Sequence, residues 1–430
     1  MTHQSPGREV PATTGPVAAG PTPARAVPTS AAGAGRPSPG PAPARGVRAR
    51  LVGVDVARGL AILGMFVAHL GDDGPAGRHD PEWFVVADGR SAALFALLAG
   101  VSLALANGRR VPPSGLALTR ARVATFVRAA VLLVIGVVLV ALGTPVLVIL
   151  PAYAVMFALA TPFLGLRRRW LLLGAGVAAV VSPTLILAAT TPTADGRPSV
   201  LARFLGTADP VELPMDELVT GPYPALVYLA YVLLGMALGR SDLTRARTQA
   251  ALVGAGVALA TLGWGTSRLA QDALGADAAP LALRLVSAAA HDDSTLEVVG
   301  NWGSSLAVLG LLLLLTRPTT AAGRGVAALL SPVAAAGAMS LTVYSVHIVA
   351  IAVLGNDVVW NPVSTAVLVT FVVVALAGAW LWRRFLGRGP LERLVRGAVD
   401  AVVPRADADG APGPDADGPR RAHADGPPRA

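Results

Sequence analysis

Long apolar segments alternate with short polar ones along most of the chain. The apolar segments are each about 20 residues long, are rich in Leu, Val and Ala, and hold few charges. A helix of about 20 residues crosses the hydrocarbon core of a bilayer, whereas the strands of a membrane barrel are about half as long. The pattern therefore predicts an all-α, polytopic integral membrane bundle of ten transmembrane helices, at residues 51–70, 84–107, 123–144, 146–166, 170–190, 221–239, 249–267, 299–316, 333–354 and 363–382.

The amino-acid composition is that of a membrane protein, and it excludes several kinds of functional site. The chain of 430 residues is 53% hydrophobic and 14% charged, with a mean hydropathy of +0.60, whereas a soluble protein is about one quarter charged. It has no cysteine, which excludes disulfides, thiolate metal ligands and a cysteine nucleophile. No H-E-x-x-H or H-x-x-E-H spacing occurs, so no metal site is expected.

The distribution of arginine predicts the topology. The net charge of +9 comes from basic residues scattered between apolar segments, which argues against a nucleic-acid partner. Every second loop is rich in arginine, for example at Arg109 with Arg110 and at 167–169, while the loops between them hold isolated arginines. Because short cytoplasmic loops carry the excess of positive charge, both termini are predicted to be cytoplasmic. The protein is expected to be a multi-pass protein of the plasma membrane.

Two segments outside the apolar region lack any hydrophobic pattern. Residues 1–48 consist largely of Pro, Ala, Gly and Arg, and residues 401–430 repeat Ala-Asp-Gly and Gly-Pro. Such compositions predict disordered tails. The expected organisation is therefore one membrane domain at 49–400 between two tails, with the lipid bilayer as a partner and the oligomeric state left open.

Four histidines are predicted to lie at or near the outer side of the membrane. They are His69, His79, His291 and His347. Histidine is the side chain best suited to acid–base chemistry near neutral pH, so their common depth suggests an outward-facing polar site. The alternative is chance, since membrane interfaces tolerate histidine.

The first predicted span carries a polar face. Asp55 and Arg58 are three residues apart and can pair on a helix, and His69 lies about three turns beyond Arg58 on the same face. Ionisable groups inside a membrane are functional candidates because burying them is unfavourable. A purely structural Asp55–Arg58 pair at the cytoplasmic interface is the alternative.

Three further segments gather polar residues next to a span. Ser340, Tyr344 and His347 share one face of the ninth span, although Ser340 also fits interhelical hydrogen bonding. The remaining candidates lie at the outer ends of the second and eighth spans, at His79, Asp88, Arg90, His291, Glu297 and Asn301.

Two motifs resemble a known family. The segments VDVARGLAILGMFVAHL and RHDPEWFVVADGRSAALFALLAG resemble the opening helices and first outer loop of membrane acyltransferases related to heparan-α-glucosaminide N-acetyltransferase. The opening helix equally resembles the bacterial YeiB-type membrane proteins. Later stretches resemble the C-terminal half of that YeiB-type branch: TGPYPALVYLAYVLLGMALGRSDL, GAMSLTVYSVHI and GPLERLVR. The last of these also predicts a short amphipathic interfacial helix.

The resemblance implies an activity. Such acetyltransferases take an acetyl group from acetyl-CoA on the cytosolic face and deliver it to an amino sugar on the far face, using a histidine of the first outer loop. That histidine corresponds to His79 here, although Pro81 and Glu82 stand where the family is expected to have Ala-Pro. The leading hypothesis is therefore an acyltransferase that uses acetyl-CoA or another acyl-CoA, with a cell-surface glycan or similar small molecule as acceptor.

The hypothesis gives each candidate residue a role. The expected catalytic residues are His79 as base or acyl carrier, Asp88 to orient it, and His347 near the acceptor. Arg58, Arg109 and Arg110 are expected to attract the phosphates of CoA. Substrate contacts are expected from Asp55, Arg58, His69, Arg90, His291, Glu297, Asn301 and Tyr344.

Two other classes of function remain open on sequence alone. Intramembrane charges and outer histidines also suit a proton-coupled transporter or exporter of a small molecule, although no internal repeat typical of transporters is evident. A structural or signalling membrane component is the third class, and it predicts that the outer histidines can be replaced without effect.

Overall fold

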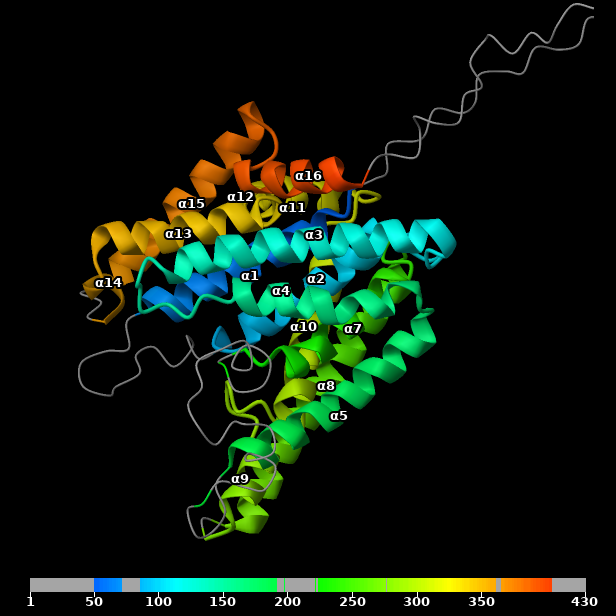
Figure 1. Ribbon diagram of the computed structural model, residues 1–430, viewed down its shortest axis with the longest axis vertical. Coiled ribbons are helices and arrows are strands. Elements are labelled where there is room, and N and C mark those ends of the chain that lie inside the picture. Colours follow the sequence, from blue (N-terminus) through cyan, green and yellow to red (C-terminus); the bar gives the residue numbers. More distant parts are fainter. Residues whose placement is uncertain are drawn as a thin grey trace, which may run out of the picture. The chain divides into compact units, whose positions relative to one another are not determined.

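The computed structural model describes residues 50–71, 86–191, 197, 221, 223–275, 277–360 and 365–403. The predicted tail at 1–48, the catalytic candidate His79 and nearly all of the tail at 401–430 lie outside these ranges. Within them the regular structure is helical throughout. Figure 1 shows α1 (Val52–Leu70), α2 (Arg90–Ala106), α3 (Gly115–Val140), α4 (Leu150–Ala160) with the 3-10 turn η2 (Thr161–Gly165), α5 (Arg168–Thr190), α7 (Ala225–Gly239), α8 (Ala246–Leu274), α9 (Pro280–Val286), α10 (Thr295–Leu315), α11 (Ala321–Leu329), α12 (Ser331–Ala338), α13 (Ser340–Leu354), α14 (Asp357–Trp360), α15 (Thr365–Phe385) and α16 (Pro390–Val402).

Each of the ten predicted apolar segments coincides with helix, which confirms the all-α membrane bundle. In the described ranges six helices are long and apolar enough to cross a membrane alone, namely α1, α3, α5, α8, α10 and α15. Four shorter apolar helices, α2, α4 with η2, α7 and α13, account for the other segments, and α11 and α12 form a pair bent by 64°. The number of ten spans and the cytoplasmic location of the termini stay predictions.

Two helix boundaries differ from those expected. The second span starts at Arg90 rather than 84, because Gly89 adopts a φ of 63°, a left-handed conformation that ends a helix and favours glycine. The predicted ninth span is interrupted at Met339, whose φ of −121° and ψ of 35° separate α12 from α13. Asp88 and Arg90 near the outer end of the second span already indicated a later start, whereas the interruption at Met339 is not visible in the hydrophobic pattern, since Met339 is itself apolar.

Small residues allow the closest helix contacts. Along the α8–α10 contact, a Cβ added to Gly256 would lie less than 3.0 Å from the backbone of Ala307, and one added to Gly303 would meet the backbone of Ala260 equally closely. Inside a bilayer the hydrophobic effect does not drive helices together, so such close backbone packing supplies much of the contact energy. The glycines therefore fix α8 against α10.

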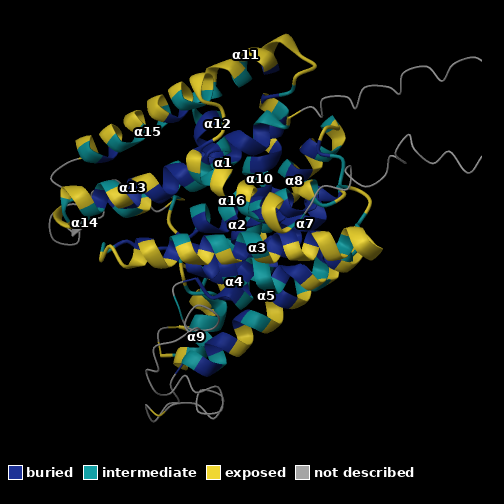
Figure 2. Cartoon of the chain, turned by 45° about the horizontal axis from the view of Figure 1, so that its top comes forward, coloured by how far each residue is buried: buried dark blue, intermediate teal, exposed yellow. Residues whose placement is uncertain are grey.

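The outward faces of several helices are apolar. Exposed valines cover α3 at Val134, Val137 and Val138, and α15 exposes Val373 and Val374. Figure 2 shows the exposed positions along α3, α5 and α15 beside the buried core helices. Extensive exposed apolar surface is unusual in a soluble protein and is expected where lipid replaces water. The fold is therefore that of a multi-pass membrane protein.

Candidate functional site

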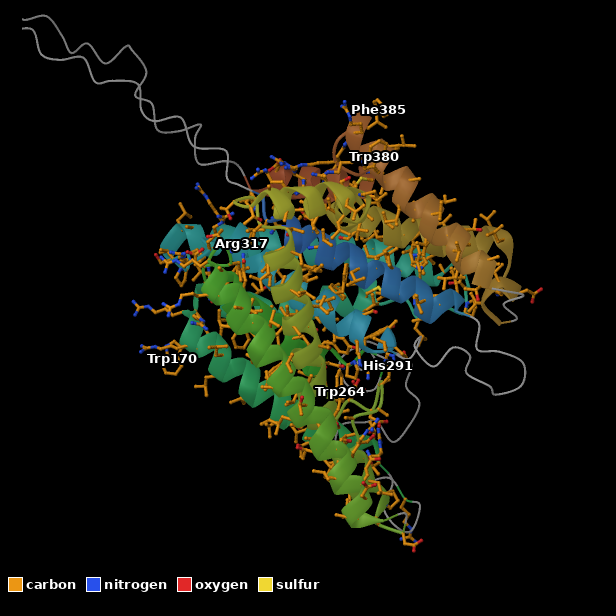
Figure 3. The ribbon with its side chains drawn as sticks, turned by 180° about the vertical axis from the view of Figure 1, so that it is seen from behind. Trp170, Trp264, His291, Arg317, Trp380 and Phe385 are labelled. Carbon is orange, nitrogen blue, oxygen red and sulfur yellow. The ribbon has the colours of Figure 1, made fainter. Side chains whose placement is uncertain are left out.

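Asp88 and His291 meet at the junction of α2 and α10. Nε2 of His291 lies 3.2 Å from Oδ1 of Asp88. Asp88 stands in the turn before α2, and His291 stands in the loop before α10. Asp88 was expected to orient His79, which lies outside the described residues, and among the described residues the imidazole of His291 lies against it. Figure 3 labels His291 at this junction, with Trp264 of α8.

The loop that carries His291 is held by one buried carboxylate. Glu297 accepts hydrogen bonds from the backbone N–H of His291 at 3.1 Å and of Asp293 at 2.7 Å. The side chain of Asn301 donates to the same carboxylate at 3.2 Å. The hydroxyl of Ser294 accepts from the N–H of Glu297 at 3.0 Å and caps α10. The predicted candidates His291, Glu297 and Asn301 thus belong to one cluster.

The pKa values of the loop residues are shifted in opposite directions. The hydrogen bond from His291 lowers the pKa of Asp88, and the same bond raises the pKa of His291. Burial, followed by the nearby charge of Glu297, raises the pKa of Asp293 to about 8. Near pH 7 the cluster therefore favours an Asp88 carboxylate and a neutral Asp293.

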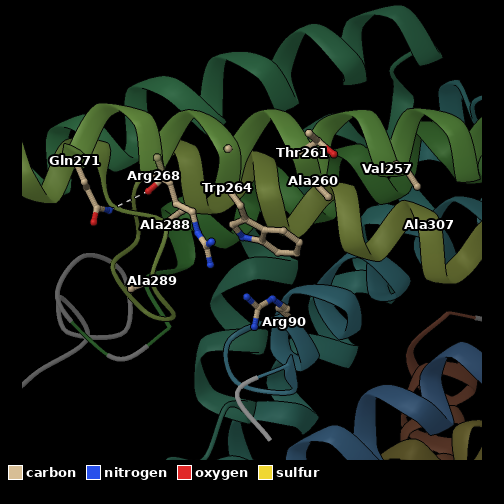
Figure 4. A pocket seen from close by; sticks show the side chains of 12 residues that line it. Arg90, Val257, Ala260, Thr261, Trp264, Arg268, Gln271, Ala288, Ala289 and Ala307 are labelled. Atoms are coloured by element: carbon tan, nitrogen blue, oxygen red, sulfur yellow. Dashed lines mark hydrogen bonds between the residues drawn. The ribbon is translucent and has the colours of Figure 1, made fainter. Parts of the chain in front are cut away.

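A cavity of about 680 Å³ adjoins this cluster. No acidic side chain lines it in the part of the chain that the structure describes, and its polar lining comes from Arg90, Thr261, Trp264, Ser267, Arg268 and Gln271. The guanidinium carbon of Arg90 lies 4.7 Å from the centre of the Trp264 ring, and Figure 4 shows Arg90 and Arg268 reaching toward that ring from different helices. The cavity therefore offers positive charge and an aromatic surface.

A second constellation is a pair of histidines between α1 and α13. Nδ1 of His69 lies 3.0 Å from Nε2 of His347, and the two rings are nearly parallel. Phe66 packs on His347 with ring centres 4.5 Å apart. Three of the four histidines expected at a common depth are described: His69 contacts His347, whereas His291 contacts Asp88, and the common depth stays a prediction.

A third constellation lines an internal cavity of about 320 Å³. Arg58 reaches it from α1, where it contacts Asp55 at 3.3 Å and hydrogen-bonds Ser102. Arg128 of α3 and Tyr153 of α4 also line it, and one Nη atom of Arg128 and the hydroxyl of Tyr153 are buried without a hydrogen-bond partner within the described ranges. Unpaired buried donors favour a polar ligand.

Arg128 is a functional candidate that sequence reasoning missed. It lies within the third predicted span, so the rule that singled out Asp55 and Arg58 as intramembrane ionisable groups applied equally to it. Tyr153 carried no such signal, because an interfacial tyrosine is common in membrane helices.

Residues from the C-terminal half complete the internal cavity. Tyr344 of α13 lines it, and its hydroxyl accepts a hydrogen bond from the N–H of Ile149 at 3.1 Å. Glu392 of α16 lines it too, and accepts from the N–H groups of Leu341 and Thr342 at 2.9 and 3.1 Å. The predicted helix at GPLERLVR is confirmed as α16, which covers one end of the cavity.

The expected phosphate-binding arginines are divided between two places. Arg58 lies in the internal cavity, whereas Arg110 pairs with Asp242 and lines a separate cavity of about 770 Å³. The backbone carbonyl of Arg109 accepts from Arg240 at 2.7 Å. This last cavity is strongly basic, with Arg110, Arg167, Arg168, Arg169 and Arg240 in its lining. In the described ranges no group of three or more His, Asp or Glu side chains is placed to hold a metal ion.

Comparison with known proteins divides the chain into two matched segments. Residues 50–266 match the family model described as heparan-alpha-glucosaminide N-acetyltransferase, catalytic. Residues 273–401 match a family described as protein of unknown function, DUF418. No curated protein matches the chain. Both resemblances expected from the sequence are confirmed, and the pairs Asp88–His291 and His69–His347 each join one matched segment to the other.

Proposed function

Because the chain belongs to the heparan-alpha-glucosaminide N-acetyltransferase catalytic family, we propose that it is a membrane acyltransferase. It moves an acyl group, acetyl in the simplest case, from cytosolic acyl-CoA to an acceptor such as a cell-surface glycan. The observation that carries the proposal is the match of residues 50–266, half of the chain, to that catalytic family. The internal cavity offers a place for the acyl donor. The cluster around Asp88 and His291, with the cavity beside it, offers a place for the acceptor.

The internal cavity suits the acyl donor. Arg58 and Arg128 bring two guanidinium groups to it, and guanidinium binds phosphate through paired hydrogen bonds. The unpaired hydroxyl of Tyr153 can donate to the thioester carbonyl oxygen, which carries negative charge as the bond to sulfur breaks. The walls between these groups are apolar, from side chains such as Phe95 and Phe157. The separate basic cavity at Arg110 offers a first electrostatic attraction for CoA phosphates.

The chemistry needs a nucleophile, a base and a leaving group. A lone pair of the acceptor nitrogen or oxygen attacks the acyl carbon, the new C–N or C–O bond forms, and the C–S bond breaks to release the CoA thiolate. A base takes the acceptor's proton, and the thiolate takes up one proton from the medium. The resemblance gives His79 the role of base or acyl carrier.

Proton-coupled transport is the second candidate. The buried hydrogen bond between His69 and His347 favours it, since imidazoles inside a membrane can pass protons. This candidate predicts no covalent transfer of the acyl group.

Calorimetry of acetyl-CoA binding to the purified full-length protein in detergent tests the donor site. Wild type and Arg122→Gln, an exposed arginine of the same helix α3, are expected to bind alike. Arg128→Gln is expected to weaken binding by about tenfold or more, because a hydrogen bond from a charged group contributes about 1.5–3 kcal/mol. Size-exclusion chromatography checks that each variant is folded. Folded wild type that binds neither acetyl-CoA nor longer acyl-CoAs contradicts the proposal.

A further inference from the structure

We infer that His291, oriented by Asp88, is the base that takes the proton from the acceptor, and that the acceptor occupies the cavity beside Arg90 and Trp264. The inference rests on the proposed function and adds to it a catalytic residue from the DUF418-type segment. Four observations carry it.

The first observation is the geometry of the Asp–His pair. Nε2 of His291 bonds the Asp88 carboxylate at 3.2 Å, while Nδ1 makes no hydrogen bond with any described residue. The His291 side chain is 36% exposed. One nitrogen is therefore held by a carboxylate that stabilises the imidazolium, and the other is available to a substrate. This is the division of roles in hydrolytic triads, although there the carboxylate holds Nδ1 and Nε2 is the base.

The second observation is backbone strain at the base. His291 has a φ of 65° and Asp293 a φ of 53°. The left-handed conformation is unfavourable for a residue with a side chain. The Glu297 carboxylate holds both residues in it by accepting their N–H groups. An exposed salt bridge adds little to stability, so stability alone does not account for a loop strained to form this one.

The third observation is the close packing of Gly89, next to Asp88, against the loop that carries His291. A Cβ added to Gly89 would lie 3.3 Å from Cβ of Ala290 and 3.4 Å from Oε1 of Glu297. Gly89 also has positive φ. The positive φ therefore favours glycine next to Asp88, and the close contacts show that the start of α2 packs against the loop of His291.

The fourth observation is the adjoining cavity. Ala288 and Ala289, just before His291, line it, and so does Arg90, just after Asp88. Residues next to Asp88 and residues next to His291 thus line the same cavity of about 680 Å³. A cavity of this volume is large enough for a sugar-sized group.

The proposed step conserves atoms and charge. The acceptor N–H or O–H proton moves to Nδ1 of His291 as the bond to the acyl carbon forms. The bond from the acyl carbon to the atom that carried the acyl group breaks, and that atom keeps the bonding electron pair. The imidazolium, stabilised by the Asp88 carboxylate, then gives up its proton, which reaches the leaving atom through water. No oxidant, reductant or further reactant is needed.

Several titratable groups face His291 and set the pH at which it works. They are Asp88 from the turn before α2, Asp293 and Glu297 from its own loop and α10, and Tyr223, whose ring centre lies 5.9 Å from that of His291. Arg90, Arg284 and Asp292 act on these carboxylates in turn. Among these, Asp88 has the largest effect on the pKa of His291, and it raises that pKa. Removing the Asp88 charge must therefore lower the pKa of the base.

The test is the pH dependence of labelled acetyl transfer by the full-length protein, compared among wild type, His291→Gln, Asp88→Asn and the control Asp272→Asn. Asp272 is an exposed carboxylate of α8 outside the cluster. His291→Gln is expected to lower kcat by about 10²-fold or more, with acetyl-CoA binding unchanged. Asp88→Asn is expected to lower kcat and to move the acidic limb of the profile to lower pH, an effect that a structural role would not produce.

The outcomes separate this inference from the proposed function. Transfer by wild type that persists in His291→Gln at more than about one third of the wild-type rate overturns the role of His291 and leaves the acyltransferase intact. An acidic limb that stays in place in Asp88→Asn overturns the role of the dyad. Absence of transfer by folded wild type with amine and hydroxyl acceptors overturns both.

Discussion

Nδ1 of His69 lies 3.0 Å from Nε2 of His347, although 278 positions separate the two residues. His69 lies in the segment that matches the acetyltransferase family, and His347 lies in the segment that matches DUF418. The contact between Asp88 and His291 joins the same two segments. The acetyltransferase-like part therefore does not form the polar sites alone, and the C-terminal segment is part of the same functional unit.

The histidine pair is expected to stabilise the bundle. His347→Leu removes the partner of His69 and leaves its Nδ1 buried without a hydrogen bond, so we expect the free energy of unfolding to fall by about 1–3 kcal/mol. The measurement is the thermal midpoint in detergent. His347→Gln keeps a polar side chain at this position and should recover part of the loss. Equal midpoints for all three proteins would show that the hydrogen bond adds nothing to stability.

The α8–α10 contact is expected to tolerate no side chain at Gly303. Gly303→Val places atoms against the backbone of Ala260, and overpacking costs about 1–3 kcal/mol or more. We expect a large loss of monodisperse protein by size-exclusion chromatography. Gly254→Val on α8 is the matched control, since a Cβ at Gly254 meets nothing within 4 Å. The same yield for both variants would contradict the described packing.

Glu392 is expected to anchor α16 on the bundle. Its carboxylate accepts two backbone N–H groups at the start of α13, a cap-like interaction whose loss costs about 0.5–2 kcal/mol. Glu392→Ala should therefore increase hydrogen–deuterium exchange over residues 390–402. Arg396→Ala, which removes an exposed pair with Asp400, should change it little. Unchanged exchange in Glu392→Ala would mean that other contacts hold α16.

The pH dependence of stability is expected to reveal Asp293. Its pKa is raised from 3.8 to about 8 in the folded protein, so unfolding releases its proton at any pH between these values. Its stabilising contribution is complete below about pH 4 and is lost as the pH rises to about 8. Relative to wild type, the thermal midpoint of Asp293→Asn should therefore rise between pH 4 and 8 and level off above. Parallel curves for the two proteins would place the pKa of Asp293 near its ordinary value.

The helices could be predicted from the sequence because a bilayer demands apolar segments of fixed length. The later start of the second span was indicated by Asp88 and Arg90, whereas the interruption at Met339 could not be predicted, because it depends on backbone conformation rather than on polarity. Among site residues, the sequence identified Asp55, Arg58, His69, Asp88, His291 and His347 as polar groups near or within spans. It could not pair Asp88 with His291 or His69 with His347, because helix packing alone brings such distant positions together. Arg128 was accessible to the same reasoning and was overlooked.

The most direct test of the acyltransferase is transfer across a sealed membrane. Purified protein is reconstituted into vesicles with the arginine-rich loops outside, labelled acetyl-CoA is added outside, and an amino sugar such as glucosamine is enclosed inside. The account predicts labelled N-acetyl product within the vesicles, formed by wild type and by Asp272→Asn but lost in His79→Ala. Movement of an unmodified solute across the membrane with no acetylated product, from protein shown to be folded, would contradict it and favour a transporter.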